Sequence, residues 1–412
     1  MRILSVATTH PLAPGDGEPA YVQEVNRGLA RLGHEITVLL PHAPGAPCSE
    51  SDGPVAIRRF RYFAPEGLER LCYNGGILPN LRRSWVARLN LPPFLAAQAA
   101  AVAREVRRFR PDLVHCHWLI SSGIMGVLTG GVRHRPIVVS AHGSDVYLQN
   151  LLFQTANRFV LERAHLCTVN SRGTRTRVLR IHPGARTEII PMGIHPEAYG
   201  RELASPELRH RLGGGDPQLL FVGRFSRDKG IVALLEAMAI LLGELPDARL
   251  GLIGFGPEER TIRAAMERLG VAHAVRVVGR VAHAEIPRWL ASADLLVLPS
   301  ERVEGLGVVL LESLASGTPV VGSRVGGIPD IVEHGVTGLL CRPADPDDLA
   351  AQCLRLARDE ALRRRTAEAG RRLVTREFCW EQVARRFDEV FRWLAAELSQ
   401  EPPGHGSPGG AP

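Results

Sequence analysis

Short apolar runs alternate with longer amphipathic runs along this chain of 412 residues, and glycines mark many of the turns between them. The first apolar run, residues 3–7, is followed by apolar residues at helical spacing and then by a second apolar run, residues 36–40. The helical spacing is carried by Val22, Val25, Leu29 and Leu32. A strand, a helix and a second strand in this order require a parallel sheet with a crossover helix. The sequence therefore predicts an α/β fold.

The same order returns in the second half of the chain. Its apolar runs lie at 219–222, 250–253 and 295–298, and the last is apolar throughout, as expected of a strand buried on both faces. A chain of this length exceeds one ordinary hydrophobic core, so two domains are expected. We expect a first domain over 1–195, a second over 196–376, a long amphipathic helix over 377–398 and a disordered tail over 399–412.

Composition restricts the class of protein. Hydrophobic residues make up 45% and charged residues 23% of the chain, as in water-soluble globular proteins, and no apolar run is long enough to span a bilayer. The seven cysteines are odd in number and none forms a CxxC pair. This pattern predicts a cytoplasmic protein in a reducing environment, with no disulfides and no structural metal site.

The net charge of +7 is divided unequally, because residues 1–195 carry +10 and the remainder carries −3. A basic half can serve nucleic acid, an anionic membrane surface or an anionic substrate, or solubility alone. We find no nucleic-acid-binding motif, so no nucleic-acid partner is expected.

Residues 80–112 interleave arginines with Trp85, Leu89, Leu91 and Phe94. Such a segment could lie on an anionic membrane surface or meet a lipid-linked acceptor. The alternative is a loop and helix that pack on their own domain, with the last arginines complementing the helix dipole.

Lys229 is the only lysine, so the other 49 of the 50 Lys and Arg residues are arginine. It follows an apolar strand, Gly223 and Arg224, and precedes Gly230 and an amphipathic run. A glycine turn at a helix N-terminus presents free N–H groups and a positive dipole to an anion. With two added cations, the stretch predicts a diphosphate site, whereas a surface lysine retained by chance is the alternative.

Glu304 and Glu312 flank a second strand–glycine–helix junction, which contains Gly305, Leu306 and Gly307. Glycines permit close backbone approach, and carboxylates accept several hydroxyl hydrogen bonds. The pair suits a polyhydroxyl ligand, with a helix cap plus an exposed glutamate as the alternative.

Polar residues also follow two strands of the first half. His117 ends the run 113–117, and His142 and Asp145 follow the run 137–140. Ligands of parallel sheets bind beyond the carboxyl ends of the strands, so these residues predict a site there.

Together these motifs resemble the retaining glycosyltransferases of family 4, also called glycosyl transferases group 1, which have the GT-B fold. Residues 223–230 are similar to the family's G-R-x-x-x-x-K-G motif, and 304–312 to its E-x7-E motif. Residues 254–257 are similar to G-x-G-P, 33–35 to G-H-E and 142–145 to H-G-x-D. The resemblance extends from residue 1 to about residue 396.

The resemblance implies two Rossmann-like parallel-sheet domains facing a central cleft, with the last helix returning to the first domain. It implies metal-independent, retaining transfer of a sugar from a nucleotide-sugar donor to an unknown hydroxyl acceptor, with no other cofactor. It places Arg224 and Lys229 on the donor diphosphate, Glu304 on sugar hydroxyls, Glu312 on ribose hydroxyls and His142 near the transferred sugar. The further donor-side residues would be Gly17, Gly223, Gly254, Gly256, Gly305, Leu306 and Gly307, and the acceptor-side residues His117 and Asp145.

Three departures from the family pattern bear on these roles. Asp16 stands where a glycine is usual and would repel phosphate, Met192 replaces a hinge asparagine, and Arg324 replaces a frequent aspartate. Two alternatives therefore stay open. One is a GT-B enzyme that hydrolyses or epimerises the nucleotide sugar, and the other is a non-catalytic sugar-nucleotide-binding subunit of a partner transferase.

Overall fold

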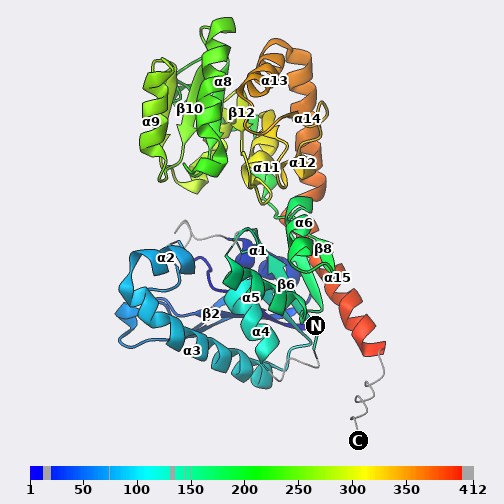
Figure 1. Cartoon of the computed structure of the whole chain (residues 1–412). Helices are drawn as coiled ribbons and strands as arrows, with labels where there is room; N and C mark the ends of the chain where they lie inside the picture. Colours follow the sequence, from blue (N-terminus) through cyan, green and yellow to red (C-terminus); the bar gives the residue numbers. More distant parts are fainter. Residues whose placement is uncertain (13–19, 74, 130–134, 144, 149, 401–412) are drawn as a thin grey trace, which may run out of the picture.

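The computed structural model of the chain describes residues 1–12, 20–73, 75–129, 135–143, 145–148 and 150–400. They form two α/β lobes, each built on its own sheet (Figure 1). The predicted α/β class with two parallel-sheet domains is confirmed. No helix among the described residues is both long and apolar enough to cross a bilayer.

The sheet of the first lobe has eight strands in the order β3-β4-β2-β1-β5-β6-β7-β8. All neighbours are parallel except β3 and β4. The strands are β1 (Arg2–Val6), β2 (Glu35–Pro41), β3 (Ser49–Asp52), β4 (Val55–Phe60), β5 (Leu113–His117), β6 (Ile137–Ala141), β7 (Leu166–Val169) and β8 (Thr187–Ile189). The helices of this lobe are α1 (Tyr21–Arg31), α2 (Ile77–Arg83), α3 (Trp85–Phe109), α4 (Ile124–Leu128), α5 (Leu151–Leu161) and α6 (Arg172–Ile181).

The sheet of the second lobe has six parallel strands in the order β11-β10-β9-β12-β13-β14. They are β9 (Gln218–Val222), β10 (Arg249–Ile253), β11 (Val275–Gly279), β12 (Leu295–Leu298), β13 (Val320–Ser323) and β14 (Leu339–Cys341). The helices are α7 (Pro206–Arg211), α8 (Ile231–Glu244), α9 (Glu259–Arg268), α10 (Ile286–Ala291), α11 (Val308–Ala315), α12 (Ile328–Ile331), α13 (Pro346–Arg358) and α14 (Glu360–Glu377). The order reverses between β9 and β12, and at such a point the loops beyond the strand ends can separate around a ligand.

The final helix, α15 (Trp380–Gln400), returns to the first lobe and packs beside α1 on one face of its sheet. Trp380, Phe387 and Phe391 enter that core together with α1 and strand residues such as Ile3. The two helices approach so closely that a Cβ on Gly28 would lie 2.5 Å from the Ala384 Cβ.

The helix expected over 377–398 differs from the observed helix α15 at both ends. Glu377 belongs to α14, and α15 begins at Trp380 because Cys379 is extended and forms a β-bridge with Ile194. At the other end, residues 399 and 400 of the expected disordered tail lie within α15, and 401–412 are outside the described residues.

Candidate active site

Lys229 and Glu304, 75 residues apart in the sequence, meet in an ion pair. The Lys229 Nζ lies 2.6 Å from the Glu304 Oε2, and the Ser300 hydroxyl donates to the same oxygen at 2.8 Å. The side chains are 20% and 10% exposed, respectively. Two stretches that the sequence indicated separately therefore form one site. The second carboxylate oxygen of Glu304 has no hydrogen-bond partner within the described ranges.

The backbone brings these residues together because β9 and β12 are neighbours in the sheet. After β9, a short 3-10 turn (Arg227–Lys229) leads to Gly230, which has a left-handed φ of 67°. A Cβ on Gly230 would lie 2.0 Å from the Pro299 carbonyl oxygen, so only glycine permits this approach. The Glu301 N–H also donates to the Asp228 carbonyl at 2.8 Å, which ties the two loops together.

Arg224 lies two residues after the end of β9 and is exposed. Across the part of the chain that the structure describes, no hydrogen bond or ion pair engages its guanidinium group. This cation is therefore available to an anionic ligand, whereas the charge of Lys229 is already paired.

Gly223, Gly254 and Gly256 hold the β9 and β10 loops against each other. Gly254 has φ of 142°, and a Cβ there would lie 1.8 Å from the Gly223 carbonyl oxygen. A Cβ on Gly256 would lie 2.2 Å from the Phe225 carbonyl oxygen. The Gly223 and Gly254 N–H groups donate to the carbonyls of Ile253 and Gly279, so they are occupied in this structure.

Phe255, between two of these glycines, was not singled out from the sequence. It is 55% exposed, and the Arg280 guanidinium lies 5.0 Å from its ring centroid. An aromatic residue between the two glycines of a turn is a sequence signal that could have identified it, because a flat nucleotide base packs well on an aromatic ring.

Gly305, Leu306 and Gly307 form the junction between Glu304 and α11. Leu306 is 3% exposed and belongs to the second hydrophobic core, whereas Gly305 lies against the first lobe. Gly307, with φ of 84°, is the N-cap of α11 and provides no side-chain cap, so the first N–H groups of this helix are open to an anion.

Glu312 lies deeper, on α11. Its Oε1 accepts a hydrogen bond from the Tyr199 hydroxyl at 3.2 Å and lies 3.5 Å from the His283 Nε2. Burial raises the pKa of Glu312. Tyr199 is a partner that the sequence did not reveal, because it lies in the segment between the lobes.

His142 and its neighbours reach the second lobe from the end of β6. A Cβ on Gly143 would lie 3.5 Å from the Gly305 Cα, and the Asn170 amide donates to the His142 carbonyl at 3.5 Å. The His142 Nε2 is buried without a hydrogen-bond partner among the described residues. Burial lowers the pKa of His142 to about 3, so the ring is neutral and its Nε2 can make one hydrogen bond.

Aromatic and imidazole rings surround His142. The ring of His117 stacks on it at 5.6 Å between centroids, while Tyr21 and Trp118 lie at 4.6 and 4.8 Å. His117 is completely buried, and both its ring nitrogens lack a partner within the described parts of the chain. It therefore lies behind His142 and supports it.

Asp145 is also buried. Its carboxylate accepts the N–H of Leu119 at 3.1 Å and that of His142 at 3.2 Å, so it fixes the backbone on which His142 is mounted. Burial raises the pKa of Asp145 to about 6, although these backbone hydrogen bonds act in the opposite direction.

The structure thus brings Lys229, Glu304 and Gly305 together and places His142 next to them across the lobe boundary. Gly17 and Asp16 lie outside the described residues. Among the residues that are described, no three His, Cys, Asp or Glu side chains are grouped so that they could hold a metal ion.

Comparison with known proteins agrees with this arrangement. Residues 16–198 match the sequence model "Glycosyltransferase Family 4", and residues 207–373 match "Glycosyl transferases group 1". The chain is a glycosyltransferase with two parallel-sheet domains of the GT-B type. It belongs to glycosyltransferase family 4, the family of group 1 glycosyl transferases.

Relatives cover most of the chain. N-acetyl-alpha-D-glucosaminyl L-malate synthase of Bacillus anthracis is 30% identical, over 73% of this chain and 79% of that protein. A GDP-mannose-dependent alpha-(1-6)-phosphatidylinositol monomannoside mannosyltransferase of Mycolicibacterium smegmatis is 31% identical, over 65% of this chain and 72% of that protein. The structure of sucrose-phosphate synthase from Thermosynechococcus elongatus has the same fold, with a TM-score of 0.75, 24% identity and coverage of 96% and 99%.

Proposed function

We propose that this enzyme transfers a sugar from a nucleoside diphosphate sugar to a hydroxyl group, with retention of anomeric configuration and without a metal ion. The observation that carries the proposal is the Lys229–Glu304 ion pair. It joins a cation suited to the diphosphate to a carboxylate suited to sugar hydroxyls. The pair lies beside Gly305, where the second lobe touches the His142 loop of the first.

Departure of the diphosphate is the step that the two cations assist. Negative charge grows on the diphosphate while the anomeric carbon becomes cationic. Arg224 is free to meet that charge, and Lys229 has three N–H donors, so it can reach a phosphate while it still contacts Glu304. Each preorganised donor of this kind lowers the barrier by about 3 kcal/mol.

The remaining groups hold the sugar and the nucleoside. The free oxygen of Glu304 accepts sugar hydroxyls, and Glu312, oriented by Tyr199, accepts those of the ribose. The neutral His142 ring is carried by the loop that lies against Gly305, next to the place proposed for the transferred sugar, and Phe255 with Arg280 provides a face for the base. We assign no covalent nucleophile, because the family resemblance implies attack by the acceptor on the face of the sugar that the diphosphate leaves, and the free oxygen of Glu304 is assigned to the sugar hydroxyls.

The donor is tested by thermal shift with UDP, GDP, ADP, dTDP and their sugar conjugates, using Lys229→Ala as the control. A ligand at 100 times its Kd stabilises the folded state by about 2.7 kcal/mol. We expect one base to stabilise the wild type and not the variant. No shift with any nucleotide would overturn the proposed donor site.

Turnover is tested with the base found in this way. NMR of the product is expected to show the anomeric configuration of the donor, and activity is expected to persist in EDTA. An inverted product would refute retention, and loss of activity in EDTA with recovery in magnesium would refute metal independence. Donor hydrolysis at the same rate with and without acceptor would instead identify a hydrolase.

For the acceptor we propose an anionic molecule, either small or lipid-linked. The first lobe carries the net positive charge, and the names of both relatives, L-malate and phosphatidylinositol monomannoside, indicate anionic acceptors for those proteins. Trp85 and Leu89 are 70% and 55% exposed at the start of α3, next to Arg82, Arg83 and Arg88.

This basic apolar face would hold the enzyme against an anionic membrane. We expect co-sedimentation with phosphatidylglycerol vesicles at low salt but not with phosphatidylcholine vesicles. Trp85→Ala should reduce it, whereas Leu128→Ser, at an exposed leucine on α4, should not. Equal sedimentation of all three proteins would contradict this role of the α2–α3 face.

A further inference from the structure

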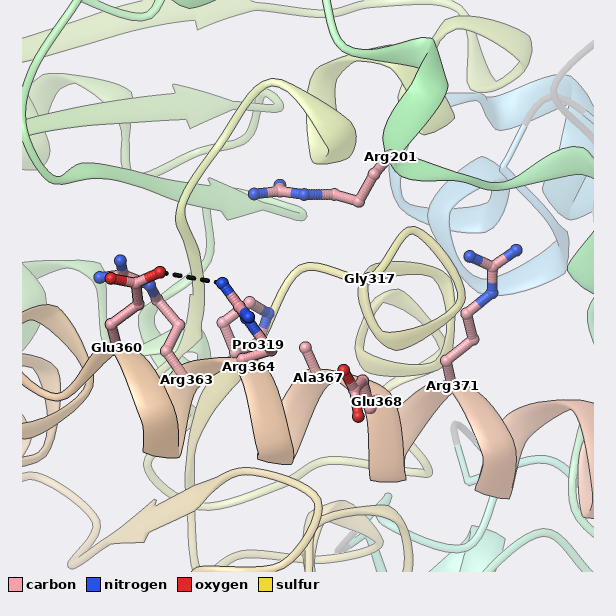
Figure 2. Close-up of a pocket in the computed structure, with 9 residues that line it drawn as sticks. All are labelled: Arg201, Gly317, Pro319, Glu360, Arg363, Arg364, Ala367, Glu368 and Arg371. Atoms are coloured by element: carbon pink, nitrogen blue, oxygen red, sulfur yellow. Dashed lines mark hydrogen bonds and ion pairs between the residues drawn. The ribbon is translucent and has the colours of Figure 1, made fainter.

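A pocket of about 380 Å³ lies on the second lobe, between Arg201, the loop after α11 and the helix α14 (Figure 2). Gly317 and Pro319 line it from the loop after α11, and Arg363, Arg364 and Arg371 project from α14. None of the residues proposed above for the donor lines it. We call it the α14 pocket.

Arg201 forms one wall with a guanidinium group that has no carboxylate partner among the described residues. Its Nη1 donates to the carbonyls of Ala291 and Ala293 at 3.1 and 2.8 Å and to the Thr318 hydroxyl at 3.2 Å. Burial lowers the pKa of Arg201, and the positive charges of Arg209 and Arg363 lower it further, against the opposing effect of Asp294. Neutral acceptors thus hold Arg201 in place, and no carboxylate of the described residues forms an ion pair with it.

The arginines of α14 add further positive charge to the pocket. Among the described residues, the Arg363 guanidinium group donates only to main-chain carbonyls, those of Leu356 at 3.4 Å and Ala357 at 3.0 Å. Arg371 forms no ion pair with any residue that the structure describes. Arg364 is paired with Glu360 at 3.1 Å.

Two carboxylates, Glu360 and Glu368, share the lining with four arginines. Glu368 is 3.9 Å from Arg372, which does not line the pocket. The wall of the α14 pocket that α14 forms therefore has two kinds of group. Its guanidinium groups can bind an anion, and its carboxylates can accept hydrogen bonds from hydroxyl groups.

We propose that the α14 pocket binds a small phosphorylated molecule that also carries hydroxyl groups. An arginine guanidinium group can donate two parallel hydrogen bonds to two oxygens of a phosphate group, and carboxylates accept hydrogen bonds from hydroxyls. The volume is within the range of sites for small molecules. A phosphorylated sugar or polyol fits all three properties.

The α14 pocket adjoins the element that carries Glu312, because α14 and α11 are tightly packed. A Cβ on Gly370 would lie 2.4 Å from the Leu314 Cδ2, and α11 carries Glu312. Tyr199, which donates to Glu312, is two residues from Arg201.

The test is calorimetric titration of the whole chain with a hexose 6-phosphate, the parent hexose and inorganic phosphate. It is made in a Lys229→Ala background, so that phosphate binding at the proposed donor site is weakened. Arg371→Gln and Arg364→Gln each remove one cation from the pocket. Arg276→Gln is the matched control, because Arg276 is an exposed arginine on the edge strand β11. Melting temperatures without ligand verify that each variant is folded.

We expect saturable binding of the hexose phosphate, no binding of the hexose and weaker binding of inorganic phosphate. Each pocket variant should weaken binding about tenfold, the effect of one charge-assisted hydrogen bond, while the control leaves it unchanged. Absence of saturable binding, or equal affinity in the pocket variants and the control, would overturn the proposal. Inorganic phosphate or the hexose binding as tightly as the hexose phosphate would overturn the assigned ligand class.

Discussion

Lys229 and Glu304 neutralise each other in the free protein, and this has a consequence for what each contributes to donor binding. A diphosphate must share the lysine with the carboxylate, whereas a sugar hydroxyl donates to the carboxylate without competing for the lysine. The pair therefore couples recognition of the two halves of the donor.

We expect Glu304→Gln to bind a nucleoside diphosphate at least as well as the wild type, because Lys229 is then released. The same variant should no longer bind the sugar conjugate more tightly than the nucleoside diphosphate. Its kcat should be lower by a factor of about 10²–10³. Calorimetry with both ligands and a steady-state assay measure these effects. Lys229→Met is the matched comparison and should weaken the binding of both ligands. Equal losses for diphosphate and conjugate in Glu304→Gln would refute the division of roles.

Protons bind differently to the buried histidines in the folded and unfolded states. Burial lowers the pKa of His115 and His142 to about 3, and burial together with the neighbouring histidines lowers that of His117. The unfolded chain therefore binds more protons below pH 6.5, so stability falls as pH decreases from 7 to 5. Asp145, whose pKa is raised to about 6, has the opposite effect. Its protonation in the folded state increases the free energy of unfolding by about 1 kcal/mol as pH decreases from 7 to 5.

His117→Phe should reduce this pH dependence, since one buried neutral histidine accounts for about 2 kcal/mol between pH 7 and 5. The free energy of unfolding is measured by urea denaturation at several pH values. Circular dichroism at pH 8 verifies the fold of the variant. An unchanged pH dependence would mean that His117 is charged or exposed in the folded protein.

At the scale of elements, the loops after β9 and β10 behave as one unit, because glycines allow their backbones to touch. Gly254→Ala should lower the free energy of unfolding by more than about 2 kcal/mol and abolish nucleotide binding, since its φ of 142° and the 1.8 Å approach exclude a Cβ. Gly243→Ala in α8 is the matched control, because no atom lies within 4 Å of its Cβ position, and it should stabilise the helix slightly. Thermal and urea melts compare the two. Similar melting of both variants would show that the loops can separate without loss.

Elements with a strong apolar period could be predicted from the sequence, and those with weak periods could not. The strand at 295–298 is buried on both faces and carries only apolar residues, so its pattern was clear. Residues 41–80 are rich in proline and glycine and have no clear apolar period, yet they contain β3 and β4, the antiparallel pair at the edge of the first sheet. β3 is polar and exposed, because an edge strand needs no apolar face.

At the scale of the molecule, the lobes touch through the N-terminus of α6 and the loop and short helix α12 that follow β13. The Arg172 N–H donates to the Asp330 carboxylate at 2.6 Å, and a Cβ on Gly173 would lie 2.6 Å from the Gly326 carbonyl carbon. No sequence pattern revealed this contact, because it depends on how two separately folded lobes are oriented. The same holds for the approach of Gly143 to Gly305, although the motifs on both sides were recognised.

Gly173→Ala should force the lobes apart at this point and reduce kcat without weakening nucleotide binding, since the donor residues stay together on the second lobe. Gly184→Ala, just after α6, is the control, because its nearest contact of 3.4 Å is ordinary. Small-angle scattering measures the separation, and kinetics measure the loss. A normal kcat in Gly173→Ala would show that this contact is not needed for turnover.

The single lysine also gives the protein an unusual chemical property. Apart from the N-terminus, amine-directed reagents have one target, and that target lies 2.6 Å from Glu304 in the proposed donor site. Acylation of a single side chain would then report occupancy of the site, and a bound diphosphate should shield it. Attachment to a surface through amines would, for the same reason, inactivate the enzyme unless donor is present during the coupling.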